Sequence, residues 1–369
     1  MLSVGFDGRA LVSPAAGVRR YSYELFGALA ALLRVRVIAV GAPRHAGLPP
    51  GVERGPSALS LPSNPGWMLT GLPSAARRAH LDVFHAPSYT APIKAPRPLV
   101  VTIHDVSYQR HPEWYPHRRD PLRRAFYRWS AHTADRIITD SSFSKAEIIA
   151  AYHVSAHIVH VVPLAAASRF EADGSQLLPD GVVPPYVLHV GDLHTRRNLE
   201  IAARAVLHVR RRNPAYARLQ LVLAGVDRGS GQALTRIEES SPGERSVSRL
   251  LGPVDDATVG ALYRGAAALV YPSRYEGFGL PLLEGMVSGT PVIAANAGSI
   301  PEVTGDAAVL LDPDDENGWA CAIESVLDSR DHAARLRAAG LRRAALFSWR
   351  RTAEATLEVY ERALAARGR

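Results

Sequence analysis

The chain contains very little cysteine and lysine and no long uninterrupted apolar segment. One cysteine, Cys321, cannot form a disulfide within the chain or supply a thiolate metal cluster, so we expect a reducing, cytoplasmic location. Cys321 lies in the helix-like run GWACAIESVL, and we expect a buried structural thiol there. No window holds about 18 apolar residues without charges, which argues against a membrane-spanning helix. The start, MLSVGFDGRALVS, lacks the pattern of a signal peptide.

Lysine is nearly absent, since only Lys94 and Lys145 occur among 43 basic residues. GC-rich codons can account for the preference for arginine. They do not account for the formal net charge of +8, which predicts acidic partners. Phosphorylated substrates, anionic lipid and nucleic acid are the candidates.

Short apolar runs alternate with longer amphipathic runs in the first half of the chain. This alternation predicts a parallel sheet with helices on both faces. Ser141 and Ser142 are candidate N-caps for the second of two clear helices. The predicted helices are residues 18–33 and 143–153, and the predicted strands are residues 34–40, 81–86, 98–104, 136–140 and 157–163.

The sequence FEADGSQLLPDGVVPP is rich in Gly, Pro and Asp, and the strand–helix pattern restarts after it. We therefore predict a first domain over residues 1–170, a linker over 171–185, a second domain over 186–348 and a C-terminal helix over 349–369. In the second domain, the predicted strands are residues 186–192, 219–226, 247–254, 267–273, 291–296 and 307–313.

Two carboxylates eight residues apart mark the stretch SRYEGFGLPLLEGMVSGTPVIAANAGSIPEV, residues 273–303. Pro281 favours the first turn of a helix that ends near Gly289. Glu276 then lies in the loop after a strand, and Glu284 lies one turn inside the helix. The pair is expected to contact different parts of one ligand.

The start of this helix is a predicted phosphate site. Gly277 and Gly279 let the backbone approach a ligand closely. The free N–H groups near Phe278, Gly279 and Leu280 favour an anion, together with the helix dipole. Glu284 suits a diol such as ribose, and Glu276 suits the hydroxyls of a group beyond the phosphate. A nucleotide sugar combines these parts.

The stretch resembles the signature of glycosyltransferase family 4, which contains retaining enzymes of the GT-B fold. Further similar blocks follow the family's order: FDGRALVSPAAGVRRYSYELFGAL, VFHAPSYTAP, VVTIHDVSYQRHPEWY, ADRIITDSSFSKAEI and YVLHVGDLHTRRNLE. The subgroup most resembled is the mannosyltransferase-like one that builds bacterial surface polysaccharides. The resemblance implies two doubly wound, Rossmann-like α/β domains facing across a cleft, with the C-terminal helix crossing back to the first domain.

The resemblance also assigns roles in the second domain. Glu276 would hold the hydroxyls of the donor sugar, and Glu284 would hold the ribose. Arg196 and Arg197 would clamp the diphosphate, since two adjacent arginines offer the fork geometry that phosphates favour. The family usually has lysine where this chain has Arg197. The loop LLGPVDD would contact the nucleobase through the backbone near Val254.

Two positions in the first domain complete the expected site. His104 ends the predicted strand at residues 98–104, and the resemblance places it near a sugar hydroxyl or the acceptor. Gly17 precedes a helix and would approach the diphosphate. Family members usually carry a second glycine where this chain has Arg19.

The resemblance implies a metal-independent hexosyltransferase without a cofactor. The arginines and the helix start would neutralise the departing nucleotide diphosphate, and that phosphate would take the acceptor's proton on the same sugar face. Asp312 and Asp314 form an Asp-x-Asp pattern that is weak evidence for a metal. GDP-mannose is the favoured donor, ahead of dTDP-rhamnose and UDP sugars. The acceptor is a hydroxyl of a glycan or lipid-linked molecule, or a soluble small molecule.

Residues 110–136 are rich in arginine and interleaved with aromatic residues. Such a stretch suits the surface of an anionic membrane, which would place the protein peripherally on the inner membrane face. Single-stranded nucleic acid also favours this mixture, but we do not expect it as a partner. A solvated helix whose aromatic residues pack on the domain is the alternative.

Three other functions compete with glycosyl transfer. A glycoside hydrolase needs two carboxyl groups on either side of one bond. Glu276 in a loop and Glu284 one turn inside the following helix match this arrangement poorly. A nicotinamide-dependent oxidoreductase needs a G-x-G-x-x-G run after a first strand, and GSGQAL at residues 229–234 lacks the third glycine. A sugar-nucleotide-binding relative without activity is disfavoured by the presence of both carboxylates, the arginines and the histidine.

Overall fold

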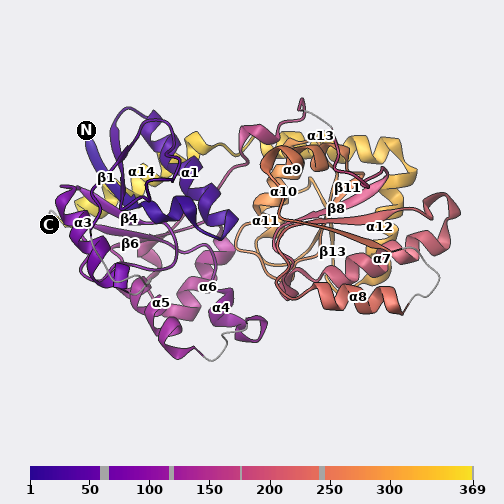
Figure 1. Ribbon diagram of the computed structural model, residues 1–369, viewed down its shortest axis with the longest axis horizontal. Helices are drawn as coiled ribbons and strands as arrows, with labels where there is room; N and C mark the ends of the chain where they lie inside the picture. The colour runs from indigo at the N-terminus through magenta and orange to yellow at the C-terminus, as the bar shows by residue number, and fades with distance from the viewer. Residues whose placement is uncertain (59–65, 116–119, 175–176, 241–245, 368–369) are drawn as a thin grey trace. The chain divides into compact units, whose positions relative to one another are not determined.

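A computed structural model describes residues 1–58, 66–115, 120–174, 177–240 and 246–367, which fold into two compact units. The first unit comprises residues 1–164 and 348–369, and the second comprises residues 165–347. Each unit contains one sheet whose paired strands are all parallel. Figure 1 shows the chain coloured along its length. The α/β class and the Rossmann-like organisation predicted from the sequence are confirmed.

Within the described residues, the sheet of the first unit has seven strands in the order β3-β2-β1-β4-β5-β6-β7. All four residues of β4 and of β5 are buried, as expected for strands covered on both faces. Five strands match predicted runs, whereas β1 and the short β3 were not predicted. The strands are β1 (Leu2–Asp7), β2 (Val35–Val40), β3 (Val52–Arg54), β4 (Val83–Ala86), β5 (Leu99–Thr102), β6 (Arg136–Thr139) and β7 (Val159–Val161).

The helices of the first unit include one from the far end of the chain. Helix α14 (Trp349–Ala365) lies beside α1 (Ala16–Ala31) and also contacts β5 and β6, as Figure 1 shows in yellow against indigo. The Tyr360 hydroxyl is 2.7 Å from Nδ1 of the buried His85. The remaining helical elements are η1 (Gly8–Val12), η2 (Trp67–Gly71), α3 (Leu72–Arg78), α4 (Ser107–Arg110), η3 (Pro112–Trp114), α5 (Pro121–Thr133), α6 (Ser142–Tyr152) and η4 (Ala156–Ile158).

The N-cap of α6 is Ser141, one of the two serines predicted for this role. Its hydroxyl accepts a hydrogen bond from the backbone N–H of Ser144 at 3.0 Å. The hydroxyl of Ser144 in turn donates to the carbonyl of His104 at 3.0 Å. The start of α6 therefore fixes the backbone just after β5.

In the described part of the second unit, the sheet has six strands in the order β10-β9-β8-β11-β12-β13. All six match predicted runs. Every residue of β8, β11 and β12 is buried. The strands are β8 (Tyr186–Val190), β9 (Gln220–Ala224), β10 (Ser248–Gly252), β11 (Ala268–Tyr271), β12 (Val292–Ala295) and β13 (Val309–Leu311).

Helix α10 (Leu280–Val287) is the helix predicted around Pro281 and Glu284. It begins after Gly279, whose φ is +94°, and Gly289 follows its end with φ +73°. The other helical elements of this unit are η5 (Ser168–Phe170), η6 (Thr195–Arg197), α7 (Leu199–Arg212), η7 (Pro214–Tyr216), α8 (Gly231–Glu239), α9 (Asp256–Gly265), α11 (Ile300–Thr304), α12 (Glu316–Asp328) and α13 (Arg330–Ala344).

Cys321 corrects one prediction. It lies on α12, as the helical pattern indicated, but it is exposed rather than buried. Its sulfur is 3.7 Å from Nη1 of Arg212 on α7. The apolar face of α12 is formed by other positions, including the buried Trp319 and Ile323. The helix-like pattern identified the helix, but it did not place the cysteine on the correct face.

The segment predicted as a linker has contacts of its own within the second unit. The guanidinium of Arg264 donates to the carbonyl of Glu171 at 3.0 Å. That of Arg249 donates to the carbonyl of Asp180 at 2.6 Å. The described parts of this segment, residues 171–174 and 177–185, are assigned to the second unit.

The buried His85 makes the first unit sensitive to acid. Burial, with a smaller effect of His104, lowers the pKa of His85 from 6.5 to about 3. The unfolded chain therefore binds a proton below pH 6.5 that the folded unit does not accept. Stability should fall by about 1.4 kcal/mol per pH unit between pH 6.5 and 4 from this group. Four of the five tryptophans lie in the first unit, so urea unfolding followed by tryptophan fluorescence reports on it.

His85→Gln removes the titrating ring but keeps hydrogen-bonding atoms. We expect a shallower decline in stability below pH 6.5 in this variant than in the unsubstituted chain. Parallel declines in the two proteins would contradict the assignment of acid sensitivity to His85.

Candidate active site

The predicted site residues of the second unit gather where the strand order of its sheet reverses. Strands β8 and β11 are neighbours at this point. From β8 the chain continues to β9 toward one edge of the sheet, and from β11 it continues to β12 toward the other edge. In doubly wound sheets, ligands generally bind outside the carboxyl ends of the strands at such a point. The loop after β8 carries Arg196 and Arg197, and the loop after β11 carries Glu276. The topology thus brings together residues 79 and 80 positions apart.

Arg197 makes the central contact between these loops. Its Nη1 donates to Glu276 Oε1 and to the Tyr271 hydroxyl, and it lies 3.3 Å from Ser273 Oγ. The guanidinium also lies 5.0 Å from the centre of the Tyr271 ring. The side chains of Arg197 and Glu276 are 11% and 6% exposed, so this is a largely buried ion pair. Such a pair has a high local charge density in a site that little water reaches.

Arg196 is held by the backbone of the other loop. Its carbonyl accepts the N–H of Arg274 at 2.9 Å, and its Nη1 donates to the carbonyl of Tyr275 at 3.2 Å. Both arginines of the predicted clamp therefore contact the segment between β11 and α10. This segment ends at the start of the helix that carries Glu284.

The segment with Glu276 is held in shape from behind by a serine and a glycine. The Ser299 hydroxyl is within hydrogen-bond distance of the carbonyls of Glu276 and Phe278, at 3.0 and 3.1 Å. Gly298 has φ +59°, and a Cβ there would lie 2.9 Å from the backbone nitrogen of Glu276. Ser299 and Gly298 were not among the predicted site residues, because both follow a different strand.

The two predicted carboxylates have different partners. Glu276 pairs with Arg197, whereas Glu284 is fully buried on α10 and its Oε2 accepts the Tyr263 hydroxyl at 3.0 Å. Gly277, Phe278, Gly279 and Leu280, which lie between them, are also buried. The predicted contacts of these residues with sugar, phosphate and ribose remain predictions.

His189 on β8 lies beneath the ion pair and carries no charge. Burial, followed by the positive charge of Arg197, lowers its pKa from 6.5 to about 3. Its ring stacks on Tyr271 with centroids 5.3 Å apart, and its Nδ1 donates to the Val270 carbonyl at 3.1 Å. The positive charge at this strand end therefore comes from arginine.

Val254 lies on the same edge of the sheet, just after β10. The neighbouring loops pack closely: a Cβ at Gly225, which has φ +157°, would lie 2.0 Å from the Gly191 carbonyl oxygen. Only glycine fits this approach between the ends of β8 and β9. Val254 is partly exposed, and its predicted contact with a nucleobase remains a prediction.

In the first unit, His104 contacts an aspartate that was not among the predicted site residues. His104 Nδ1 is 2.7 Å from Oδ2 of Asp140, which follows β6 and is 2% exposed. Burial tends to lower the pKa of His104, but the charge and hydrogen bond of Asp140, with Asp105 and the Pro87 carbonyl, raise it overall. The strand register could have revealed this pair, since positions 104 and 140 follow neighbouring strands.

Gly17 lies in the first turn of α1 and is exposed. A Cβ at this position would meet no atom within 4 Å, so the fold itself does not require glycine here. Arg19, where the family usually has glycine, donates from Nη1 to the Ser13 carbonyl at 2.7 Å. The arginine therefore ties the preceding loop to the helix.

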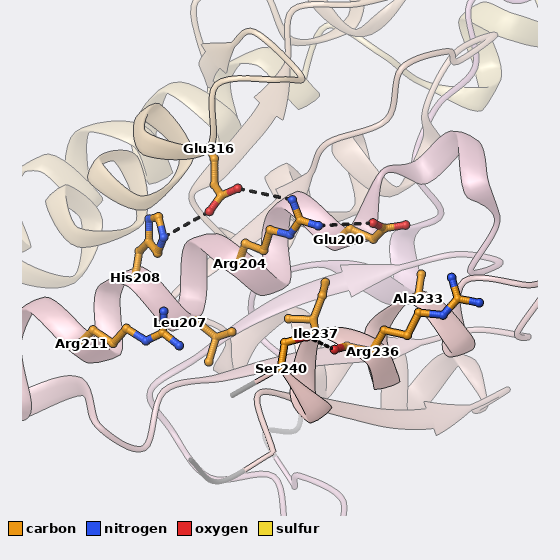
Figure 2. A pocket seen from close by; sticks show the side chains of 10 residues that line it. All are labelled: Glu200, Arg204, Leu207, His208, Arg211, Ala233, Arg236, Ile237, Ser240 and Glu316. Carbon is orange, nitrogen blue, oxygen red and sulfur yellow. Dashed lines mark hydrogen bonds and ion pairs between the residues drawn. The ribbon is translucent and has the colours of Figure 1, made fainter. Parts of the chain in front are cut away.

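A separate groove of about 470 Å³ lies between α7 and α8 and contains none of the predicted site residues (Figure 2). Glu316 bridges Arg204 and His208 along one wall, at 3.7 and 3.2 Å. Arg204 also lies 3.9 Å from Glu200. These charges largely satisfy one another, so the groove is not our candidate active site.

The Asp-x-Asp pattern is engaged in protein contacts. Asp314 forms an ion pair with Arg274, and its backbone N–H donates to Asp312 Oδ1 at 2.8 Å. Within the described ranges, no group of three or more His, Cys, Asp or Glu side chains is arranged to hold a metal ion. None of the helices in the described ranges has the length and apolar composition that a membrane span requires.

Two family models match the chain, one in each half. The model described as Glycosyltransferase Family 4 matches residues 15–168, and that described as Glycosyl transferases group 1 matches residues 184–329. The chain is 32% identical over 287 residues to O-antigen chain mannosyltransferase B of Escherichia coli, covering 76% of this chain and 74% of the relative. It is 30% identical over 321 residues to the MMP alpha-(1->4)-mannosyltransferase of Mycolicibacterium hassiacum, covering 79% and 73%.

Solved structures share the fold over nearly the whole chain. A sucrose-phosphate synthase from Thermosynechococcus elongatus has a TM-score of 0.76 at 22% identity, covering 99% of this chain and 100% of that one. WaaG, described as a glycosyltransferase involved in lipopolysaccharide biosynthesis, has a TM-score of 0.69 at 15% identity, covering 98% and 99%. Anabaena HepE in complex with UDP-glucose has a TM-score of 0.69 at 18% identity, with the same coverage.

The buried ion pair leads to a stability prediction. Arg197→Met leaves the Glu276 carboxylate buried without its cation and should cost about 3 kcal/mol. The double variant Arg197→Met/Glu276→Gln should recover most of this loss, because no uncompensated charge remains. Urea unfolding followed by circular dichroism measures both effects.

Arg228→Met is a matched control in the same unit, since Arg228 pairs with Asp192 at 3.2 Å but both side chains are 46% exposed. It should change stability by less than about 1 kcal/mol. Additive losses in the double variant at positions 197 and 276 would show that the two side chains are not coupled.

Proposed function

The chain belongs to glycosyltransferase family 4 and has the GT-B fold, and on this premise we propose the reaction that it catalyses. The protein transfers a hexose, with mannose the first choice, from a nucleotide diphosphate sugar to a hydroxyl of a glycan or lipid-linked acceptor. The transfer retains the anomeric configuration, requires no metal and serves surface polysaccharide synthesis.

The observation that carries this proposal is the contact of Arg197 with Glu276 at the point where the second sheet reverses its strand order. Arg196 contacts the same segment, and that segment leads into α10. Guanidinium groups and the first N–H groups of a helix are the donors that phosphate oxygens prefer. We place the diphosphate against Arg196, Arg197 and the start of α10.

Charge neutralisation is the proposed source of catalysis. The bond between the sugar's anomeric carbon and the phosphate oxygen breaks, and negative charge grows on the diphosphate. Arg196 and Arg197 stabilise this charge. The acceptor oxygen bonds to the anomeric carbon on the face that the phosphate leaves, and the departing phosphate takes the acceptor's proton. Glu276 holds hydroxyls of the sugar, Glu284 holds the ribose, and His104 contacts a sugar hydroxyl or the acceptor.

The choice of mannose rests on relatives. The two mannosyltransferases described above align over about three quarters of this chain. Other relatives are glycosyltransferases of different specificity, including a D-inositol 3-phosphate glycosyltransferase of Thermobispora bispora at 32% identity over 251 residues. HepE was solved with UDP-glucose. The alternative donors are therefore UDP sugars and dTDP-rhamnose, and the alternative acceptor is a soluble small molecule.

A panel of GDP-mannose, UDP-glucose and dTDP-rhamnose, scored by nucleotide release and thermal shift, tests the proposal. We expect GDP-mannose to give the fastest release, with EDTA leaving the rate unchanged and NMR of the product showing retained anomeric configuration. Glu276→Gln and Arg196→Met should each lower turnover by about 100-fold or more, because each removes a group that acts on the reacting parts of the donor.

Arg350→Met is the matched control, since the Arg350 side chain is 81% exposed on α14. It should leave turnover unchanged. Near-normal turnover in either site variant would contradict the assigned roles. Loss of activity in EDTA with recovery on adding Mg²⁺ would contradict the metal-independent mechanism.

We also propose that α5 touches an anionic membrane. Leu122, Ala125 and Trp129 recur along one side of this helix and are exposed, with Leu122 81% and Trp129 36% exposed. Arg123 and Arg128 are exposed beside them. An apolar stripe flanked by arginines suits the boundary of anionic headgroups. A lipid-linked acceptor would be reached from such a position.

Flotation with vesicles tests the membrane proposal. The protein should bind vesicles containing phosphatidylglycerol and not vesicles of phosphatidylcholine alone. Leu122→Gln/Trp129→Gln should weaken binding by about 10-fold or more, since each buried apolar side chain contributes about 1.5–3 kcal/mol. Leu177→Gln, at a position 84% exposed in the second unit, should bind as the unsubstituted chain does. Equal binding by the α5 variant would exclude this helix as the contact.

A further inference from the structure

Asp140 and His104 lie side by side because of the register of the first sheet. Strands β5 and β6 are parallel neighbours, and Thr102 is paired with Ile138. Two residues further along each strand direction are His104 and Asp140. The Ile103 N–H donates to the Ile138 carbonyl at 2.9 Å, which continues the pairing beyond the last residue of β5. The hydrogen bond of 2.7 Å between Nδ1 and Oδ2 is therefore built into the sheet.

The aspartate is buried at a cost to the fold. Asp140 is 2% exposed, and no described residue makes a hydrogen bond to its Oδ1. Burial raises its pKa, and the contact with His104 opposes this effect. Asp140 also directly precedes the N-cap of α6, where the helix dipole favours a negative charge. A buried carboxylate that contacts one ring nitrogen need not stabilise the fold. It does strongly constrain the orientation and the tautomer of the ring.

The contacts around the His104 ring fix its plane. The ring of Tyr21 meets it edge-on with centroids 4.7 Å apart, and that of Tyr89 does so at 5.9 Å. The Tyr21 hydroxyl is engaged by Thr102 Oγ1 at 2.8 Å and is not available to the histidine. No described residue offers His104 Nε2 a hydrogen bond of good geometry, although the Pro87 carbonyl is near enough to favour a proton on the ring.

The charged groups that face His104 favour its protonated form. Asp140 lies after β6, and Asp105 follows His104 in the chain; both raise its pKa. Its other titratable neighbours are Tyr21, Tyr89 and His85. Burial keeps His85 uncharged above about pH 3, so it adds no repulsive charge near neutral pH.

We propose that Asp140 is a positioning residue for glycosyl transfer, which holds the proton of His104 on Nδ1 and directs Nε2 to the substrate. This inference rests on the proposed function, in which His104 contacts the donor sugar or the acceptor. When the ring is neutral, Nε2 is an acceptor for a hydroxyl; when it is protonated, Nε2 donates. Without Asp140, the neutral ring can move its proton to Nε2 and rotate, and both changes misplace the contact.

The first test measures the ring and needs no substrate. Long-range ¹⁵N–¹H NMR of the full chain reports the tautomer and the pKa of each histidine, and His104→Gln identifies the signal of interest. We expect the Nδ1–H tautomer in the unsubstituted protein. In Asp140→Asn the pKa of His104 should fall by about 1–3 units, because a negative charge in contact with the ring is lost.

The second test measures catalysis with the donor in the panel that the unsubstituted protein turns over. Asp140→Asn should lower kcat by about 10- to 100-fold while KM for that donor changes by less than about threefold. The limb of the pH–rate profile that reports His104 should move toward lower pH. A purely structural role for Asp140 would not move this limb.

Asp135→Asn is a matched control at the opposite end of β6. The Asp135 carboxylate accepts the Leu99 N–H at 2.7 Å and pairs with Arg97 and Arg367, so it is also a structural contact of the same strand. This variant should leave the His104 tautomer, its pKa and the pH profile unchanged.

The outcomes separate the positioning role from the proposed function. An unchanged tautomer and pKa in Asp140→Asn would overturn the role of Asp140, and so would an altered ring with unchanged kcat. If the unsubstituted protein turns over no nucleotide sugar, the proposed function fails. The NMR measurement still decides whether Asp140 fixes the ring.

Discussion

The buried ion pair between Arg197 and Glu276 is the interaction on which the candidate site depends. It links the loop after β8 with the loop after β11, at the point where the sheet reverses its strand order. A buried charge must keep a partner, so the positions of the two loops are coupled. Tyr271 and Ser273 contact the same guanidinium, and His189 below it stays neutral. The pair itself is neutral overall, and Arg196 adds a positive charge to the segment that leads into α10.

The first unit places its polar pair after two neighbouring strands that are consecutive in the sheet, away from the point where its strand order reverses. Its sheet brings the ends of β5 and β6 together and sets a histidine against a buried aspartate. A second polar network lies deeper: Tyr360 of α14, His85 and Thr102 are joined by hydrogen bonds of 2.7 Å. Because α14 comes from the end of the chain, this network also ties the C-terminal helix to the first unit. In both units, neighbouring parallel strands carry polar groups at one edge.

Sequence patterns were sufficient for much of the fold and for part of the site. Eleven strands, the capping of α6 by Ser141 and the start of α10 after Gly279 follow from local periodicity and turn chemistry. The periodicity of α12 identified the helix but gave the wrong environment for Cys321, which is exposed. The burial of one residue depends on which neighbours cover its face, and no local pattern contains that information.

The sequence by itself determined the residue types of the site and their order, since the Glu276–Glu284 spacing and the adjacent arginines are local features. Only the tertiary structure decided the partners: Arg197 with Glu276, Glu284 with Tyr263, and His104 with Asp140. The physical reason is sheet topology and register. A parallel sheet joins strands that are far apart in the chain, and the order in which they pair selects which side chains meet.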